Sequence, residues 1–214
     1  SFLDNMSIIS TNFSESNLIN TNFANSSIYN SNFNKTDMQA SLVINSSIHN
    51  SDFSNSNLYD SDFSNSYIEN TNFSSTILDY VILNNIEAKN IIFENARLWK
   101  TNLDKSNFEN SNFKNSDNYR STYLETKLKN ANFENSRLSH TNFSDAKFSE
   151  VNLSNIYPIS SNFKNADFNN SSKINTCLED DLFSKILNRV FRITGINTSE
   201  SMQPLTDSLL EICN

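Results

Sequence analysis

An apolar residue recurs at every fifth position of this chain from Leu3 to Phe168, with interruptions at Asn118 and Pro158. Two positions before each apolar residue stands a small residue, usually Ser or Thr. The position directly before the apolar residue usually holds Asn or Asp. A period of five fits neither an α-helix, with about 3.6 residues per turn, nor a free strand, which alternates about every two residues. The pattern therefore predicts a repeat architecture in which each unit points one central residue inward.

The central residues sort into four columns when they are compared at intervals of twenty residues. Two columns are rich in phenylalanine and the other two are mainly aliphatic. One of the phenylalanine columns reads Phe13, Phe33, Phe53, Phe73, Phe93, Phe113 and Phe133. Columns that keep one residue type indicate four-sided coils stacked like on like around a dry interior. At about 4.8 Å per coil, the repeats predict roughly eight and a half coils and a rod about 40 Å long.

The units follow the motif small residue, Asp or Asn, Leu or Phe, polar residue, any residue. Ser-Asp-Phe-Ser-Asn at 51–55 and 61–65 and Ala-Asn-Phe-Glu-Asn at 131–135 are close copies. This pattern resembles the pentapeptide-repeat family, and the resemblance extends over most of the chain. It implies an all-β solenoid, a right-handed quadrilateral β-helix of about eight coils. Asn118 and Pro158 fall in one column, where we expect each to mark a bulge or loop.

The five-residue phase ends at Lys173, and a helical pattern follows it. Residues 176–179, Thr-Cys-Leu-Glu, match a capping box, and a second helix is expected over about 204–213. The sequence therefore predicts a β-helix over residues 1–175 and a C-terminal segment of two α-helices over 176–214. That segment either caps the last coil or connects to a following domain.

Charge narrows the classes of partner. The formal net charge of the 214 residues is −8, which argues against general nucleic-acid binding. Residues 1–80 hold eight Asp/Glu against one Lys, whereas residues 81–175 hold twelve Lys/Arg against ten Asp/Glu. No apolar run is long enough for a membrane span. Because the chain begins with Ser, we expect it to be a processed or excised piece of a longer protein.

The sequence gives no sign of catalysis or of a cofactor. His49 and His140 are expected almost five coils apart, roughly 20 Å along the rod. Neither Cys177 nor Cys213 has a histidine nearby in the sequence, and no group of Cys, His and acidic residues has metal-site spacing. We therefore predict no catalytic residue, no cofactor and no metal ligand.

One side of the predicted rod carries the residue types that are enriched at protein-binding hot spots, namely Tyr, Trp and Arg. They flank the column that runs from Leu18 to Leu98, and the corners nearby become larger at Val81, Ile86 and Ile91. That change indicates either an apolar contact patch or a locally repacked coil. The candidate partner-binding residues are Tyr59, Ile77, Arg97, Trp99, Tyr119, Arg137 and Tyr157.

Three functions remain open at this stage. The layout resembles the β-helix of SopA/NleL-like bacterial effectors, which implies a module that binds a host protein after secretion into the host cell, with a HECT-like ubiquitin ligase elsewhere in the full chain. The pentapeptide-repeat resemblance also implies an alternative, a DNA mimic in the bacterial cytoplasm that binds DNA gyrase, although residues 81–175 lack the acidic character this needs. The third is a structural spacer. The oligomeric state is left open.

Overall fold

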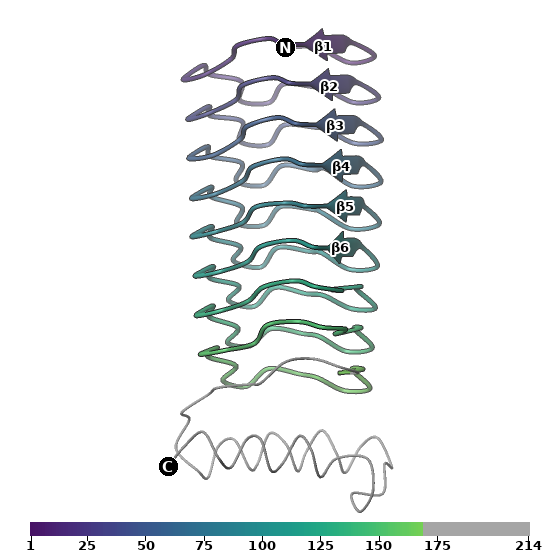
Figure 1. Ribbon diagram of the computed structural model, residues 1–214. Coiled ribbons are helices and arrows are strands. Elements are labelled where there is room, and N and C mark those ends of the chain that lie inside the picture. The colour runs from purple at the N-terminus through teal and green to yellow at the C-terminus, as the bar shows by residue number, and fades with distance from the viewer. Residues whose placement is uncertain (169–214) are drawn as a thin grey trace, which may run out of the picture.

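The backbone of this protein returns to the same place every twenty residues. The structure is a computed structural model, and it describes residues 1–168 (Figure 1). The amide of Leu3 donates to the carbonyl of Asn22 at 2.7 Å, and the amide of Asn22 donates to the carbonyl of Ser1 at 3.0 Å. The same pairing repeats down the rod, so each coil is hydrogen-bonded to the next one. The predicted β-helix is confirmed.

Regular strands form along one of the four sides. They are β1 (Ser7–Ile9), β2 (Ser27–Tyr29), β3 (Ser47–His49), β4 (Tyr67–Glu69), β5 (Glu87–Lys89) and β6 (Asn107–Glu109). These strands make one parallel sheet in sequence order, with a register shift of twenty that places Ile8 beside Ile28. The other three sides pair through single bridges, such as Asn12 with Asn32. Each side has only five residues, so the chain turns a corner before a longer strand can form.

We name each of the four sides after the first central residue that it contains: the Leu3, Ile8, Phe13 and Leu18 sides. Strands β1–β6 lie on the Ile8 side. The central residues from Phe23 to Phe163 are buried. Rings stack along the Phe13 column, as Phe33 and Phe53 do at 4.5 Å between centroids, and at the end of the Leu3 column, where Phe143 and Phe163 stack at 5.1 Å. Rings of the two columns meet edge to face, as Phe53 and Phe63 do at 6.1 Å. Both arrangements are favourable for aromatic pairs.

Many of the polar positions of the motif make a specific hydrogen bond, although the buried hydroxyls of Ser41 and Ser136 have no partner. Asp52, directly before the centre Phe53, accepts a bond from the amide of Ser54 at 3.0 Å, which fixes the turn. The small residue fills the inner corner, where the hydroxyl of Ser46 donates to the carbonyl of Phe23 and accepts from the amide of Ser26, both at 3.1 Å. Where the small residue is replaced, as at Val81, Ile86 and Ile91, the side chains are also buried. The larger corners there are interior packing.

Every fifth residue from Asn5 to Asn165 has a positive φ between 49° and 62°. This left-handed conformation strains most residues with a Cβ, and Asn and Asp tolerate it best. Asn or Asp accordingly fills 20 of these 33 positions. The described residues thus turn every corner without glycine, because the only glycine of the chain is Gly195.

The prediction of a bulge or loop at Asn118 and at Pro158 is wrong. Asn118 is fully buried in its column, and its side chain accepts a hydrogen bond from the Tyr123 hydroxyl at 2.5 Å and donates to the Ser116 hydroxyl at 2.8 Å. Pro158 is also buried at a centre, and its carbonyl accepts from the amide of Ser161 at 3.1 Å as other centres do. The five-residue phase therefore continues through both positions.

The predicted two-helix segment, with Cys177, Cys213 and the boundary at residue 175, lies outside the described residues. Within residues 1–168 no helix has the length and apolar character to cross a bilayer. The same part of the chain contains no cluster of three or more His, Cys, Asp or Glu placed to hold a metal ion.

Replacement of Phe73 by Ala should lower the free energy of unfolding by about 3–5 kcal/mol, because the cavity lies in a stacked aromatic column. Chemical denaturation monitored by circular dichroism measures this change. Phe2→Ala is the control, since Phe2 is 86% exposed and should leave the stability nearly unchanged. Equal effects of the two changes would contradict the inward phase.

Replacement of Tyr123 by Phe should destabilise the fold by about 1–3 kcal/mol, because the buried Asn118 carbonyl oxygen loses its donor. The double variant Tyr123→Phe with Asn118→Leu removes both polar partners and should recover most of that loss. Denaturation of the single and double variants measures the coupling. Additive losses would show that the two side chains stabilise the fold independently.

The pH dependence of the same variant gives a second measurement. Burial holds the pKa of Tyr123 well above its usual value, so the phenol stays protonated in the folded protein. An unfolded tyrosine ionises near pH 10, at about its reference pKa, so this residue's contribution to stability is complete below that pH and is lost as pH rises further. Tyr123→Phe should show a smaller loss above about pH 10.

Candidate protein-binding face

The Leu18 side comprises residues 16–20 and the equivalent five residues of each later coil, ending at 156–160. Three positions in each unit make three rows along the outside of the rod, and in these rows Asp79 and Ser139 are nonetheless buried. The first row lies before the centre (17, 37 and so on), the second row after it (19, 39 and so on), and the corner row contains residues 20, 40 and so on. All seven candidate residues lie here: Ile77, Arg97, Arg137 and Tyr157 in the first row, and Tyr59, Trp99 and Tyr119 in the second.

Arg97 is held in place by a carboxylate of the preceding coil. Its Nε donates to Oδ1 of Asp79 at 2.9 Å, and its Nη2 lies 2.6 Å from Oδ2. The hydrogen bond that Arg97 donates to Asp79 raises the pKa of the Arg97 guanidinium above its usual value. The guanidinium also lies 5.0 Å from the centre of the Trp99 ring. Both carboxylate oxygens of Asp79 thus contact Arg97, whose guanidinium also lies near the exposed Trp99 ring.

Tyr119 is the centre of a cluster of rings and cations. The guanidinium of Arg137 lies 4.7 Å from its ring centre and that of Arg120 lies 5.1 Å away, distances at which cations are attracted to aromatic faces. Trp99 meets the ring edge to face at 6.0 Å, and His140 does so at 5.5 Å. This cluster joins three successive coils into one aromatic and cationic surface.

Sequence reasoning did not place the corner row in this site. Lys100 donates a hydrogen bond to the Tyr80 hydroxyl at 2.7 Å and lies 4.7 Å from that ring, and Tyr80 contacts Tyr59 at 5.4 Å. The absence of asparagine from these corner positions is the sequence feature that could have identified the row. From residue 80 to residue 140 the other three corners hold seven Asn at nine positions, whereas this row reads Tyr80, Lys100, Arg120 and His140.

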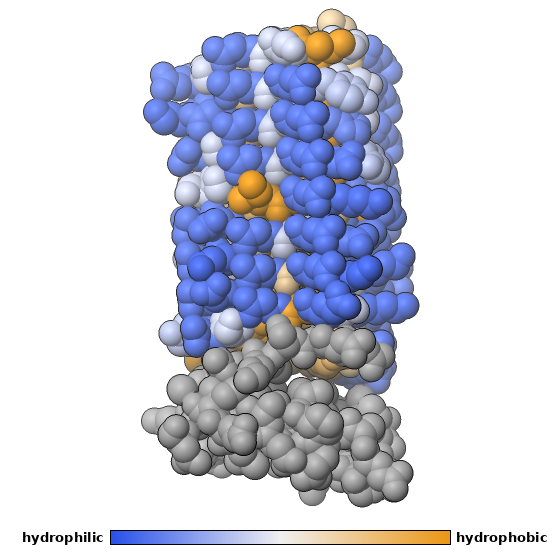
Figure 2. All heavy atoms as spheres, in the orientation of Figure 1, coloured by the Kyte–Doolittle hydropathy of each residue, from blue (hydrophilic) through white to orange (hydrophobic). Residues whose placement is uncertain are grey.

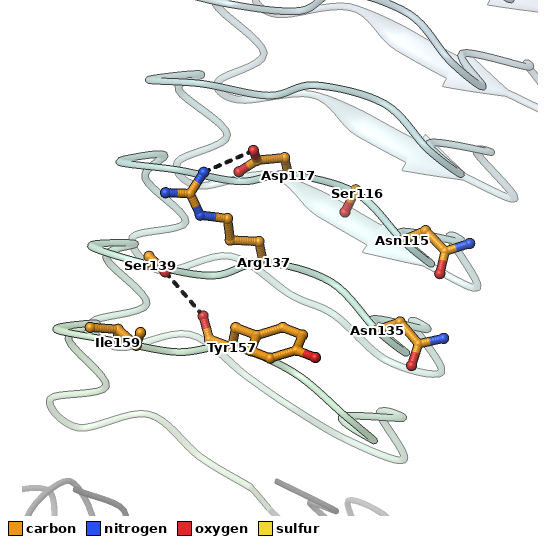
Figure 3. Close-up of a pocket in the computed structure, with 8 residues that line it drawn as sticks. All are labelled: Asn115, Ser116, Asp117, Asn135, Arg137, Ser139, Tyr157 and Ile159. Atoms are coloured by element: carbon orange, nitrogen blue, oxygen red, sulfur yellow. Dashed lines mark hydrogen bonds and ion pairs between the residues drawn. The ribbon is translucent and has the colours of Figure 1, made fainter. Parts of the chain in front are cut away.

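An open groove lies at the C-terminal end of the Leu18 side (Figure 3). It has a volume of about 430 Å³ and crosses three coils. Arg137 lies in the middle coil and reaches Asp117 of the preceding coil at 3.1 Å, while the Ser139 hydroxyl donates to the Tyr157 carbonyl at 3.3 Å. Tyr157 and Ile159 form the far wall and are both exposed. The groove therefore continues the aromatic and cationic surface.

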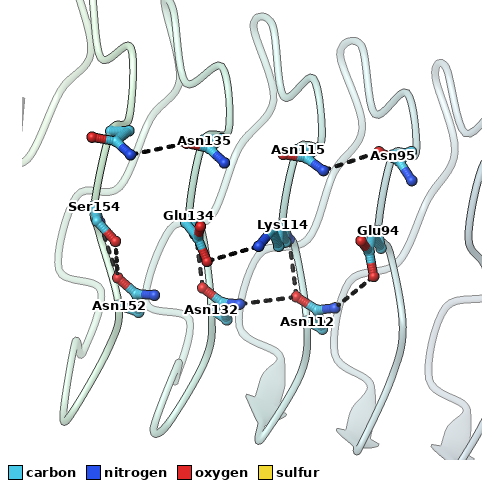
Figure 4. A network of polar contacts seen from close by, with 11 residues as sticks. Glu94, Asn95, Asn112, Lys114, Asn115, Asn132, Glu134, Asn135, Asn152 and Ser154 are labelled. Atoms are coloured by element: carbon cyan, nitrogen blue, oxygen red, sulfur yellow. Dashed lines mark hydrogen bonds and ion pairs between the residues drawn. The ribbon is translucent and has the colours of Figure 1, made fainter.

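The Phe13 side differs in character because its polar groups bind one another. Asn115 donates to Asn95 at 3.2 Å, Asn132 donates to Asn112 at 3.3 Å, and Lys114 pairs with Glu134 at 3.0 Å (Figure 4). Much of the rod surface in Figure 2 is hydrophilic, with a small apolar patch about half way along. A polar ladder with its own partners offers little to a ligand.

The family model described as pentapeptide repeats matches in eight copies, over residues 9–41, 44–87, 89–117 and 125–155. No curated protein matches significantly.

Several solved structures are similar to this chain at low identity. One is HetL of the cyanobacterium Nostoc sp. strain PCC 7120, involved in heterocyst differentiation regulation, with 14% identity, 81% of this chain and 87% of that chain covered, and a TM-score of 0.42. Another is a trypsin-treated variant of QnrB1, a plasmid-mediated fluoroquinolone resistance protein, with 13% identity, coverage of 89% and 96%, and a TM-score of 0.41. These scores support no functional conclusion. On the match of the family model to most of its length, this chain belongs to the pentapeptide-repeat family.

Proposed function

We propose that this protein is a protein-interaction module that binds its partner through the Leu18 side. The observation that carries the proposal is the cluster of Trp99, Tyr119 and Arg137 on a mainly polar rod. Such side chains dominate binding energy because they offer a large rigid contact area with a polar end. The rings are held by cations and by neighbouring rings, so binding costs little additional ordering.

The strained corner row supports the same proposal. Lys100, Arg120 and His140 have φ between 56° and 60°, where Asn is the usual residue in this chain. Left-handed backbone at a residue other than Asn, Asp or Gly costs free energy, and such strain is concentrated at functional sites. None of these three side chains has a buried role in the fold. A function at the surface would account for this cost, although Lys35, Lys105 and Glu125 carry the same strain on other sides.

The partner we propose is a host-cell protein, bound after secretion of a bacterial effector, as the resemblance to SopA/NleL-like proteins implies. The ligase activity of such an effector would belong to another part of the full-length protein. Mixed charge supports this choice over mimicry of DNA, because residues 81–168 hold eleven Lys/Arg against ten Asp/Glu. The acidic residues 1–80 are the one observation in favour of the alternative, a protein that binds gyrase in the bacterial cytoplasm.

Trp99→Ala and Tyr119→Ala should each weaken partner binding by about 2 kcal/mol or more, because each removes a central ring of the cluster. The measurement is a pull-down with this chain from host-cell lysate, followed by titration of the captured protein. Tyr67→Ala is the matched control, since Tyr67 is an exposed aromatic on the Ile8 side.

Two outcomes would contradict the proposal. Loss of the folded state in Trp99→Ala and Tyr119→Ala would show that these rings stabilise the rod. Capture of purified gyrase, with inhibition of supercoiling that survives both changes, would favour the gyrase alternative and a different face.

Replacement of Arg120 by Asn should stabilise the rod by about 0.5–1 kcal/mol, because Asn tolerates the left-handed backbone better. The same change should weaken partner binding, since it removes one of the two cations at Tyr119. Thermal unfolding and the binding titration measure the two effects. Asn55→Arg, at a left-handed corner of the Phe13 side away from the groove, is the reverse control and should destabilise the rod without an effect on binding. A stabilised Arg120→Asn that binds normally would exclude this cation from the site.

A further inference from the structure

The Leu18 side carries opposite charge in its two halves. In residues 16–80 its charged side chains are Asp37, Asp60 and Asp79, a sum of −3, although Asp79 is buried and paired with Arg97. In residues 96–160 they are Arg97, Lys100, Asp117, Arg120 and Arg137, a sum of +3. When two copies of this face meet with their rods antiparallel, the acidic half of each copy therefore lies opposite the basic half of the other.

We propose that the Leu18 sides of two copies of this chain bind each other in antiparallel orientation, with Asp60 of each copy opposite Arg120 of the other. The two-fold axis would lie in the interface, at a height along the rods between the levels of Tyr80 and Lys100. A two-fold axis perpendicular to both rods and lying in the interface keeps each row opposite the same row of the second copy. Each contact then occurs twice, as in any isologous dimer.

This register makes complementary pairs in all three rows. In the first row Asp37 lies opposite Arg137, and in the corner row Asp60 lies opposite Arg120. In the second row two of the four opposed pairs are apolar or aromatic, Ile19 with Ile159 and Tyr59 with Tyr119, and these four side chains are partly or largely exposed in the single chain. The other two pairs are Gln39 with Ser139 and Asp79 with Trp99, of which Asp79 and Ser139 are buried.

Neighbouring registers are less favourable because they oppose like charges. A shift by one coil in one direction places Lys100 opposite Lys100 of the second copy. A shift in the other direction places Asp37 opposite Asp117. A parallel arrangement places each acidic half against an acidic half. The antiparallel register with full overlap opposes no like charges, whereas both neighbouring registers do, and like charges across an interface are a strong penalty.

The central charges are available for a second copy. Within residues 1–168, neither Asp60 nor Arg120 has an ion pair, and Arg120 contacts only the Tyr119 ring through its guanidinium. Arg137 bonds Asp117 through one nitrogen, Nη1, so a further carboxylate could approach its other nitrogen. Asp60 and Arg120 therefore form the contact that best tests the proposal.

The size of the face sets the expected strength. Eight coils of about 4.8 Å and five residues of about 3.3 Å give a flat area of roughly 600 Å² per copy. The total of roughly 1,200 Å² lies at the lower end of specific interfaces, so we expect a reversible dimer in the micromolar range. Because this dimer would cover Trp99 and Tyr119, a partner at the same face would have to displace the second copy.

The test is sedimentation equilibrium of the full chain over a range of concentrations, without any other partner. The wild type should dimerise reversibly, and Asp60→Arg and Arg120→Asp should each raise the dissociation constant about tenfold or more, because each reversal acts twice per dimer. An equimolar mixture of the two single variants should restore dimers, since both opposed pairs are then of opposite charge. Asp62→Arg, on the Leu3 side, is the matched control and should dimerise as the wild type does.

Restored dimers in the mixture would support the proposal, since a misfolded variant could not give this result. A wild type that stays monomeric well above the micromolar range overturns it. A dimer that neither reversal weakens also overturns it and assigns the contact to another surface. Because no partner is present, these outcomes are independent of the pull-down with Trp99→Ala and Tyr119→Ala.

Discussion

The structure depends on a left-handed backbone conformation at every fifth residue. This corner, repeated from Asn5 to Asn165, limits each side to three extended residues and directs one of them inward. Hydrogen bonds to the neighbouring coil are then satisfied at a fixed offset of about twenty residues, and like residues stack on like. Burial of the columns stabilises the coils, but the corner determines which residues can form a column at all.

Function in such a rod can differ from side to side. The Phe13 side satisfies its own polar groups through asparagine ladders, whereas the Leu18 side collects rings and cations that remain accessible. The strained corner row also lies on the Leu18 side. Both the proposed partner site and the proposed antiparallel dimer follow from that side, because its rows combine aromatic area with a reversal of charge.

Most of the fold could be predicted from the sequence, because each five-residue unit repeats the same local physics. Asn118 was misinterpreted because its hydrogen-bond donor, Tyr123, is itself a substitution at the next centre, and only the folded coil shows that both point inward. The seven candidate residues were brought to one side as the period predicts. The corner row was missed because its members share no residue type, and what unites them is a backbone angle.

The coil also constrains how such a protein can change over time. Duplication or loss of twenty residues would lengthen or shorten the rod and leave every later side chain on its original side. Duplication of five residues would move all later residues to the adjacent side and divide the aromatic and cationic surface between two faces. Whole coils are therefore the units by which this lineage can grow while its recognition surface stays aligned.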